Sequence, residues 1–211
     1  MGIIFVMKFN FNTYFFKYSS LILVLVANFS YVTGVQANAI IKKIEAIESQ
    51  LGARIGVSIY DVTDNKLWHH NGDTRFPLMS TFKTLACAKL LFDLEKGLQS
   101  FDTSSIVTQS SLVKWSPVTE KYIGKKFTLK QACSAAMIMS DNTATNIVLT
   151  GIKGPKALTQ FMRSIGDEVT RLDRIEPYLG EALDGDKRDT TSPNAMVKSL
   201  NTLLFGNTLS Q

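Results

Sequence analysis

One stretch of the chain, residues 81–96 (TFKTLACAKLLFDLEK), is apolar on almost every side of a helix. A surface helix carries its hydrophobic residues in one stripe, whereas a helix that is hydrophobic all round is buried in the middle of a domain. Gly97 is placed to end this helix, because glycine readily adopts the left-handed conformation that follows a helix. With 211 residues, 45% of them hydrophobic, the chain has enough apolar material to surround such a helix.

Shorter patterns on both sides of this helix predict the other elements. Alternating apolar residues over 53–61 and a returning segment over 66–70, joined by turn residues (TDN), predict an antiparallel hairpin. Residues 128–131 (TLKQ) have the capping-box pattern that opens a helix. Further helices are predicted over 40–51, 128–139, 142–149, 155–165 and 193–204, with a long ordered loop over 174–191. A helix, a hairpin and then many helices predict an α+β fold with an antiparallel sheet.

The first 37 residues differ in composition from the rest of the chain. They contain Lys8 and Lys17, no acidic residue, an apolar run over 21–27 and small residues before position 38. A basic start, a short apolar segment and a small-residue exit are typical of a secretory signal. The alternative is a membrane anchor, but the run is well short of the ~20 residues that a span needs. We therefore expect export, cleavage near Ala37, and no stable membrane anchor; either Met1 or Met7 can be the start.

The charge and the small inventory of metal-binding residues exclude several classes of protein. The net charge is +5, but no run of five or more Lys or Arg occurs, so we expect no nucleic-acid partner. Two cysteines and two histidines are too few for a zinc-finger or iron–sulfur module. His69 and His70 are adjacent on a predicted strand and face opposite ways, which favours neither a paired metal site nor a Ser-His-Asp triad. Cys87 and Cys133 either form a disulfide in an oxidising compartment or are buried thiols.

A serine and a lysine at the start of the buried helix are the first candidates for chemistry. Lys83 lies in the first turn, where burial is costly unless the amine is paired or deprotonated. Ser80 is three residues earlier, so the lysine can accept its hydroxyl proton and activate it as a nucleophile. The alternative is that Ser80 caps the helix and Lys83 reaches solvent. Ser111 and Lys114 repeat the same spacing in a loop-like region.

Two further groups of polar residues lie later in the chain. Residues 140–142 (SDN) stand between two predicted helices, where they either cap the helices or place a hydroxyl and a carboxamide for proton relay and amide binding. Glu176 lies in the long loop, followed by Pro177. It is either a solvated loop charge or a general base for water.

Together the motifs at 80–83 (STFK), 140–142 (SDN) and 176–179 (EPYL) resemble, in order and spacing, the class A serine β-lactamases. The resemblance covers the chain from about residue 40 to its end. The segments 75–80, 86–91, 171–177 and 188–191 look most like the carbenicillin-hydrolysing branch. The resemblance implies the α+β fold of the β-lactamases and D,D-peptidases, a helical domain plus an antiparallel sheet. It also implies that Cys87 and Cys133 form a disulfide, and that residues 38–211 are the N-terminal part of a catalytic domain.

The resemblance further implies an acyl-enzyme mechanism that hydrolyses the β-lactam ring of penicillins and confers antibiotic resistance. Ser80 attacks the lactam carbonyl, and Lys83, or Glu176 through a water, takes its proton. Ser140 passes a proton to the departing ring nitrogen, Asn142 holds the amide side chain of the substrate, and Glu176 activates the deacylating water. The backbone N–H of Ser80 supplies half of an oxyanion hole.

Three more residues match family positions. Trp115 matches an aromatic residue at the cleft entrance, the alternative being ordinary partial core. Arg174 and Asp189 match an ion pair that closes the ends of the catalytic loop, the alternative being a surface pair worth under ~1 kcal/mol. The resemblance implies a small-molecule β-lactam as the binding partner, no cofactor, no metal, a monomer and a periplasmic location.

The sequence departs from the family at two places. Gly180 stands where the family usually has an asparagine that helps to hold the deacylating water. The third family motif, K-T-G or R-T-G on a strand beyond the loop, is absent from these 211 residues, and with it the C-terminal strands of the sheet. We therefore expect little activity from the 211-residue chain alone. Two alternatives stay open, a penicillin-binding D,D-peptidase and an inactive, truncated non-enzymatic product.

Overall fold

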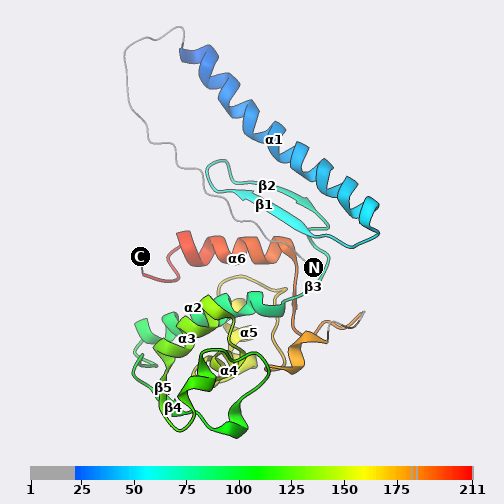
Figure 1. Ribbon diagram of the computed structural model, residues 1–211. Helices are drawn as coiled ribbons and strands as arrows, with labels where there is room; N and C mark the ends of the chain where they lie inside the picture. Colours follow the sequence, from blue (N-terminus) through cyan, green and yellow to red (C-terminus); the bar gives the residue numbers. More distant parts are fainter. Residues whose placement is uncertain (1–21, 182, 184, 211) are drawn as a thin grey trace. The chain divides into compact units, whose positions relative to one another are not determined.

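The computed structural model describes residues 22–181, 183 and 185–210 (Figure 1). The chain divides into two compact units. The first consists of Met1–Thr74 with Ser192–Lys198, and the second of Arg75–Thr191 with Ser199–Gln211. All ten predicted site residues belong to the second unit, so the site can be described within that unit alone.

The first unit contains helix α1 (Ile22–Leu51) and the antiparallel hairpin of β1 (Val57–Asp61) and β2 (Lys66–His70). The hairpin prediction is confirmed. The helix predicted to begin at residue 40 begins at Ile22 instead, because the preceding stretch has no proline and only one glycine to interrupt it. Residues 1–21 of the predicted signal lie outside the described residues. No helix within the described range is long and apolar enough to span a membrane.

One histidine of the hairpin, for which the sequence predicted no role, contacts α1. His70 pairs with Glu48 of α1 through its Nε2 atom. The other carboxylate oxygen of Glu48 accepts hydrogen bonds from the backbone of Ile55, at 2.6 Å, and from the side chain of Asn71, at 2.9 Å. These contacts lower the pKa of Glu48, the hydrogen bond from the Ile55 backbone most of all. His70 therefore helps to fasten α1 to the hairpin.

The second unit is built around helix α2 (Phe82–Glu95), as its all-round apolar sequence predicted. Helices α3 (Leu129–Met139), α4 (Asn142–Gly151) and α5 (Pro155–Ser164) pack with it, and α6 (Pro193–Phe205) has its last residues in this unit (Figure 1). Gly97, in the left-handed conformation, follows α2. Hydrophobic side chains exposed by 3% or less form the core around α2: Phe82, Leu85, Leu90, Val148, Leu158, Phe161 and Met162.

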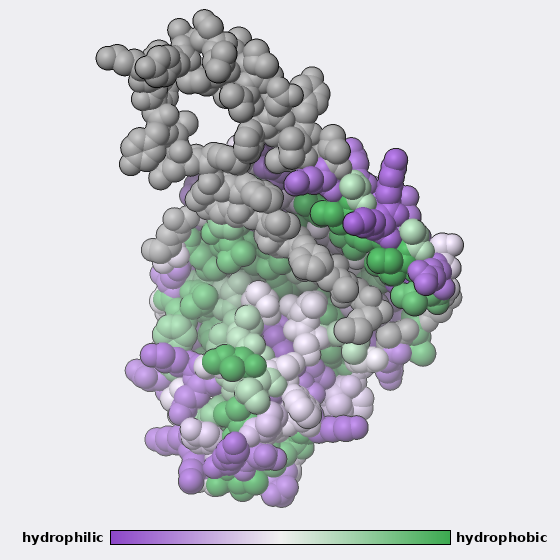
Figure 2. All heavy atoms as spheres, turned by 45° about the horizontal axis from the view of Figure 1, so that its top comes forward, coloured by the Kyte–Doolittle hydropathy of each residue, from purple (hydrophilic) through white to green (hydrophobic). Residues whose placement is uncertain are grey.

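Two very short antiparallel ladders complete the second unit. Strand β3 (Phe76–Pro77) pairs with β6 (Thr190–Thr191), and β4 (Ser104–Ile106) pairs with β5 (Lys126–Thr128). Ladders of two or three residues are too short to give a periodic signal, which is why the sequence did not predict them. The β3–β6 ladder brings the end of the long loop beside the segment that leads to Ser80. Hydrophobic residues also reach the surface, in patches between hydrophilic ones on the face shown in Figure 2.

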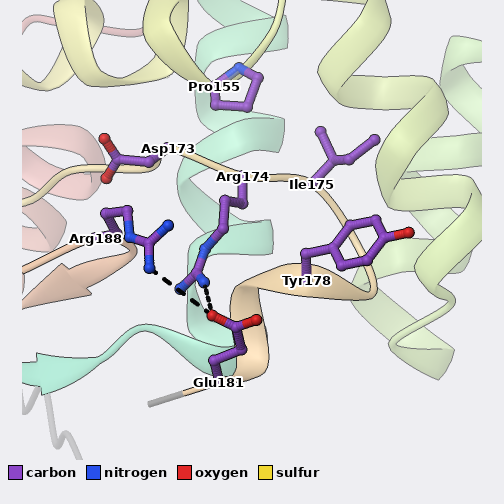
Figure 3. A pocket seen from close by; sticks show the side chains of 7 residues that line it. All are labelled: Pro155, Asp173, Arg174, Ile175, Tyr178, Glu181 and Arg188. Carbon is purple, nitrogen blue, oxygen red and sulfur yellow. Dashed lines mark hydrogen bonds and ion pairs between the residues drawn. The ribbon is translucent and has the colours of Figure 1, made fainter. Parts of the chain in front are cut away.

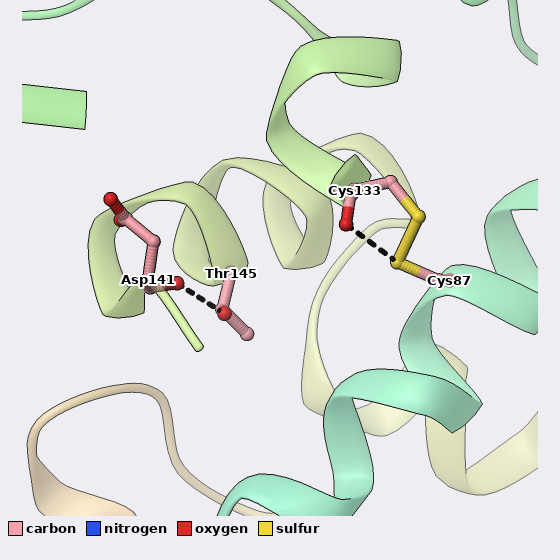
Figure 4. The surroundings of a disulfide bond; sticks show 4 residues. All are labelled: Cys87, Cys133, Asp141 and Thr145. Carbon is pink, nitrogen blue, oxygen red and sulfur yellow. Dashed lines mark hydrogen bonds between the residues drawn. A yellow bond between two sulfur atoms is a disulfide. The ribbon is translucent and has the colours of Figure 1, made fainter. Parts of the chain in front are cut away.

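A disulfide links two of the helices in the second unit (Figure 4). Cys87 of α2 and Cys133 of α3 are 46 residues apart in the sequence, and their Cα atoms are 5.8 Å apart. The disulfide prediction is therefore confirmed, and the alternative of two free thiols is wrong. The bridge joins the helix that follows Ser80 to the helix that leads into Ser140.

Candidate active site

The structure brings the two ends of the S-x-x-K motif to one place. Ser80 lies in the short 3-10 helix η1 (Met79–Thr81) and is exposed, whereas Lys83, one turn later in α2, has a side chain that is only 2% exposed. The Lys83 ammonium donates hydrogen bonds to the Ser140 carbonyl at 2.7 Å, to Ser140 Oγ at 2.9 Å and to Asn142 Oδ1 at 2.6 Å. The alternative in which Lys83 reaches solvent is therefore wrong.

Ser140 connects the lysine to Ser80. It ends α3 in the left-handed conformation, with φ of 53°, and its hydroxyl donates a hydrogen bond to Ser80 Oγ at 2.9 Å. Met79, immediately before Ser80, also has a positive φ, of 47°. Non-glycine residues in this region carry strain, which is typically found where a site demands an unusual backbone. The three side chains form one continuous chain of contacts, Lys83–Ser140–Ser80.

The remaining residues of the S-D-N motif hold this arrangement in place. Asp141 is fully buried and caps α4 through its carboxylate, which accepts a bond from the Ala144 backbone at 2.8 Å. The same carboxylate accepts two backbone bonds and one hydroxyl bond from Val118 and Thr119 of the facing loop. The predicted capping role is present, and the second role of fixing the loop was not foreseen. Asn142 donates from its amide to the Lys114 carbonyl at 3.0 Å.

Glu176 reaches the same cluster from the long loop. Its carboxylate is 3.7 Å from the Lys83 ammonium and its side chain is 9% exposed, so the alternative of a solvated loop charge is wrong. The side-chain amide of Asn146 forms two hydrogen bonds with the backbone of Glu176. It donates to the Glu176 carbonyl and accepts from the Glu176 N–H, both at 3.0 Å. Sequence reasoning missed Asn146. The available signal was its place four residues after Asn142, on the same face of α4.

Burial shifts the pKa values of the two charged groups in opposite directions. Desolvation raises the pKa of Glu176 above its ordinary value, and the nearby Lys83 ammonium partly counteracts this. Desolvation lowers the pKa of Lys83, and Glu176 partly counteracts that shift in turn. Both groups are thereby brought closer to neutral pH, which suits a pair that exchanges protons with a substrate.

Trp115 lies at the mouth of this cluster. Its side chain is 63% exposed, so the alternative of partial core is wrong. The indole Nε1 donates to the Met139 carbonyl at 3.0 Å, and the Trp115 carbonyl accepts from the Asn142 backbone at 2.9 Å. A positive φ of 66° accompanies this double attachment. Trp115 is thus held beside Asn142 and stays largely exposed to solvent.

Arg174 and Asp189 join the two ends of the long loop. Asp189 is 1% exposed and its carboxylate accepts three hydrogen bonds: from Arg174 Nε at 2.5 Å, from the Arg174 backbone at 3.0 Å and from the Asp173 backbone at 2.7 Å. The Asp189 N–H in turn donates to the Asp173 carboxylate at 3.2 Å. The alternative of a solvent-exposed surface pair is wrong, because the carboxylate is buried and multiply bonded.

The outer side of the long loop borders a hollow of about 560 Å³ (Figure 3). Arg174 and Arg188 both approach the Glu181 carboxylate there, and Tyr178 stands exposed on the loop. Gly180 follows in the same short turn, η4 (Tyr178–Gly180). A Cβ atom added at Gly180 would meet only the Cε atom of Met79, at 3.9 Å, so the space for a side chain is open.

The second S-x-x-K spacing has a structural explanation. The Ser111 hydroxyl donates to the Thr108 carbonyl at 2.8 Å and accepts from its N–H, forming a capping box around the 3-10 helix η2 (Gln109–Ser111). Lys114 contributes its carbonyl to Asn142, as described above. No three His, Cys, Asp or Glu side chains in the described ranges are arranged to hold a metal ion.

Comparison with known proteins shows which family the chain belongs to. The sequence profile described as "Beta-lactamase enzyme family" matches residues 39–211. The chain belongs to the β-lactamase family.

Individual relatives refine the assignment. β-Lactamases CARB-3 and PSE-4 of Pseudomonas aeruginosa are 53% and 52% identical over 168 residues, which is 80% of this chain and 58% of each relative. The chromosome-encoded β-lactamase of Vibrio parahaemolyticus is 54% identical, with a TM-score of 0.78 over 80% of this chain and 64% of that one. An ancestral class A β-lactamase has a TM-score of 0.78 at 47% identity, over 80% of this chain and 65% of that one.

These findings confirm the predicted family and fold. The chain is a class A β-lactamase relative with the α+β fold of that family, and CARB-3 and PSE-4 are among the relatives that it resembles. The chain spans about three fifths of the length of the curated relatives that it matches.

Proposed function

We propose that the protein hydrolyses the β-lactam ring of penicillins through a serine acyl-enzyme and so confers antibiotic resistance. The observation that carries this proposal is the unbroken line of contacts from the buried Lys83 ammonium through Ser140 Oγ to Ser80 Oγ, at 2.9 Å for each hydroxyl contact. A serine hydroxyl in such a line can lose its proton as it attacks a carbonyl carbon. Family membership supports the reaction class.

In the proposed first half-reaction, Ser80 Oγ attacks the lactam carbonyl, and its proton passes to Lys83 in its neutral amine form, or to Glu176 through a water. The carbon–nitrogen bond of the ring then breaks, and Ser140 delivers its proton to the departing nitrogen while it receives the proton that was taken from Ser80. Ser140 is well placed for this because its hydroxyl contacts both Lys83 and Ser80. Asn142 and Trp115, adjacent at the mouth, would receive the amide side chain of the substrate.

In the proposed second half-reaction, Glu176 takes a proton from water, and the resulting hydroxide attacks the acyl ester. The ester bond to Ser80 breaks, the penicilloate leaves, and the proton returns to Ser80. The buried carboxylate, fixed by Asn146, is a suitable general base because its raised pKa makes it a better proton acceptor than a free glutamate. The ion pair between Arg174 and Asp189 would hold the long loop, and with it Glu176, in the position that this step needs.

We further propose that the protein is exported to the periplasm with cleavage near Ala37, and that it acts as a monomer. The composition of residues 1–37 supports export. A periplasmic location also agrees with the Cys87–Cys133 disulfide, since such bonds persist in oxidising compartments.

The proposal is tested by mass spectrometry of the purified 211-residue chain mixed with benzylpenicillin. We expect one covalent adduct with the full mass of the penicillin, located on the peptide that contains Ser80. The Ser80→Ala variant should form none, while the matched Ser111→Ala variant, which alters the surface copy of the motif, should form the adduct normally. An adduct on another residue, or equal labelling of Ser80→Ala, would contradict the proposal. An adduct that persists for hours would instead favour the D,D-peptidase alternative.

A further inference from the structure

A second hollow of about 380 Å³ lies in the second unit, away from the cluster around Ser80. Helix α5 forms one wall and the segment before the long loop forms the other. The Thr159 hydroxyl pins these walls together, because it donates to the Leu172 carbonyl at 3.0 Å and accepts from its N–H at 2.9 Å. The side chains that line it are three cations, one carboxylate and two uncharged residues: Lys156, Arg163, Arg171, Asp173, Thr159 and Leu172.

The positive charge in this hollow is only partly neutralised. The Nη1 atom of Arg163 donates hydrogen bonds to two neutral acceptors, the backbone carbonyls of Asp167 and Thr170, the latter at 2.9 Å. Its nearest carboxylate is Glu168, at 3.5 Å, whose side chain is 79% exposed and therefore well screened by water. Lys156 makes no ion pair within the part of the chain that the structure describes.

Arg171 and a neighbouring arginine add to the same positive field. Arg171 forks onto Asp173 through Nε, at 2.8 Å, and Nη2, which leaves Nη1 without a hydrogen bond to any described residue. Arg75 donates to the Val169 carbonyl and to Thr190 Oγ1, both at 2.9 Å and both uncharged. Burial lowers the pKa of Arg75, and repulsion from Arg171 and Arg163 lowers it further, while the Asp167 carboxylate opposes part of this shift.

We propose that this hollow binds a phosphate group. A tetrahedral oxyanion presents several acceptor oxygens at once, which matches the spare N–H groups of Arg163 and Arg171 and the Lys156 ammonium. The volume suits a single phosphate with part of the molecule that carries it. The phosphate comes either from solution or from a lipid headgroup. The proposal does not depend on β-lactam hydrolysis, since none of these side chains belongs to the cluster around Ser80.

The test is calorimetric titration of inorganic phosphate into the full 211-residue chain, at ionic strength held constant with chloride. We expect saturable binding at one site. Lys156→Gln should weaken it about fivefold, the factor for one unit charge in contact through water. Glu168→Gln should tighten it, because a competing carboxylate is removed from the rim. Lys125→Gln removes the same charge as Lys156→Gln from an exposed position elsewhere and should change nothing.

A second arm identifies the source of the phosphate. Phosphatidylglycerol vesicles that retain the wild-type chain, but less of Lys156→Gln, point to a lipid headgroup; titration by inorganic phosphate with no such retention points to the free ion. The proposal is overturned by the absence of saturable phosphate binding, by Lys156→Gln binding as tightly as wild type, or by Glu168→Gln binding more weakly. Because all variants keep Ser80 and Glu176, acylation by benzylpenicillin reports separately on the proposed function.

Discussion

The Lys83 ammonium lies 3.7 Å from the Glu176 carboxylate, and both side chains are more than nine-tenths buried. Their approach is longer than a hydrogen bond, because Lys83 already donates to Ser140 and Asn142. Burial makes the charged form of each group costly, and their mutual attraction offsets only part of that cost. Keeping this pair buried therefore costs stability, and the cost agrees with the proton-transfer roles that we propose for the two residues.

The first prediction concerns pH. Glu176 acts as a base only when deprotonated, so its raised pKa should move the acid limb of kcat for benzylpenicillin above the 4.5 of an ordinary glutamate. The lowered pKa of Lys83 should move the alkaline limb below 10.5. The measurement is kcat against pH, with Glu168→Gln as a control that leaves both limbs in place. An acid limb at or below 4.5 would show that Glu176 is not the group that titrates.

The second prediction is that Glu176→Gln traps the acyl-enzyme. Glutamine fills the same space but cannot accept a proton, so deacylation should fall by about 10²–10⁴, the usual contribution of a general base. Intact-mass spectrometry after mixing with benzylpenicillin should then show a long-lived adduct on Ser80. If the adduct clears as fast as in wild type, Glu176 does not activate the water.

Most of the fold could be predicted because its elements have strong local signals. The all-round apolar pattern of residues 81–96 predicted a buried central helix, and the capping box at Thr128 predicted the start of α3. The ladder of β3 with β6 could not be predicted, because two-residue strands have no period. The start of α1 was placed too late, since the apolar spacing of residues 40–51 marks only its amphipathic part.

The site was predicted in its parts and not in its connections. The spacing of Ser80 and Lys83 did not distinguish helix capping from activation of Ser80 as a nucleophile, because a lysine in the first turn of a helix can reach solvent. Only tertiary structure places the Ser140 carbonyl and hydroxyl around that ammonium. Asn146 was missed because its place one turn after Asn142 was the available signal, and that spacing does not point to Glu176, 30 residues away in the sequence.

The third prediction concerns Gly180. Its backbone does not require glycine, and the nearest atom to an added Cβ is 3.9 Å away, so larger residues fit. Gly180→Asn should speed deacylation by about tenfold, the effect of one added hydrogen bond of roughly 1.4 kcal/mol to the attacking water. Gly180→Ala is the matched control, since it adds a Cβ without an amide. Equal rates for the two variants would mean that the amide does not hold the water. The measurement is the decay of the adduct on Ser80.

The fourth prediction is that Asp189→Asn loosens the long loop. The buried carboxylate accepts charge-assisted bonds from Arg174 and backbone bonds from both Asp173 and Arg174. Losing its charge should cost about 1.5–3 kcal/mol of unfolding free energy. Hydrogen exchange should rise over residues 174–189, and deacylation should slow more than acylation. Lys187→Gln removes an exposed charge from the same loop and should do much less. A cost below about 0.5 kcal/mol would instead match a surface pair.

The fifth prediction separates stability from chemistry at the disulfide. Replacing Cys87 and Cys133 together by alanine removes a link across 46 residues, which should lower the free energy of unfolding by about 2–4 kcal/mol through the entropy of the unfolded chain. Urea denaturation of the double variant against the oxidised wild type measures this loss, with Ser134→Ala as a neighbouring control.

Chemistry should survive the same change. Neither cysteine side chain makes a hydrogen bond with the side chains of Ser80, Lys83 or Ser140, so the folded fraction of the double variant should still form the benzylpenicillin adduct at the wild-type rate. This outcome would mean that the disulfide stabilises the packing of α2 against α3 and takes no part in proton transfer. A folded double variant that no longer acylates would show instead that the Lys83–Ser140–Ser80 contacts depend on the covalent link between the two helices.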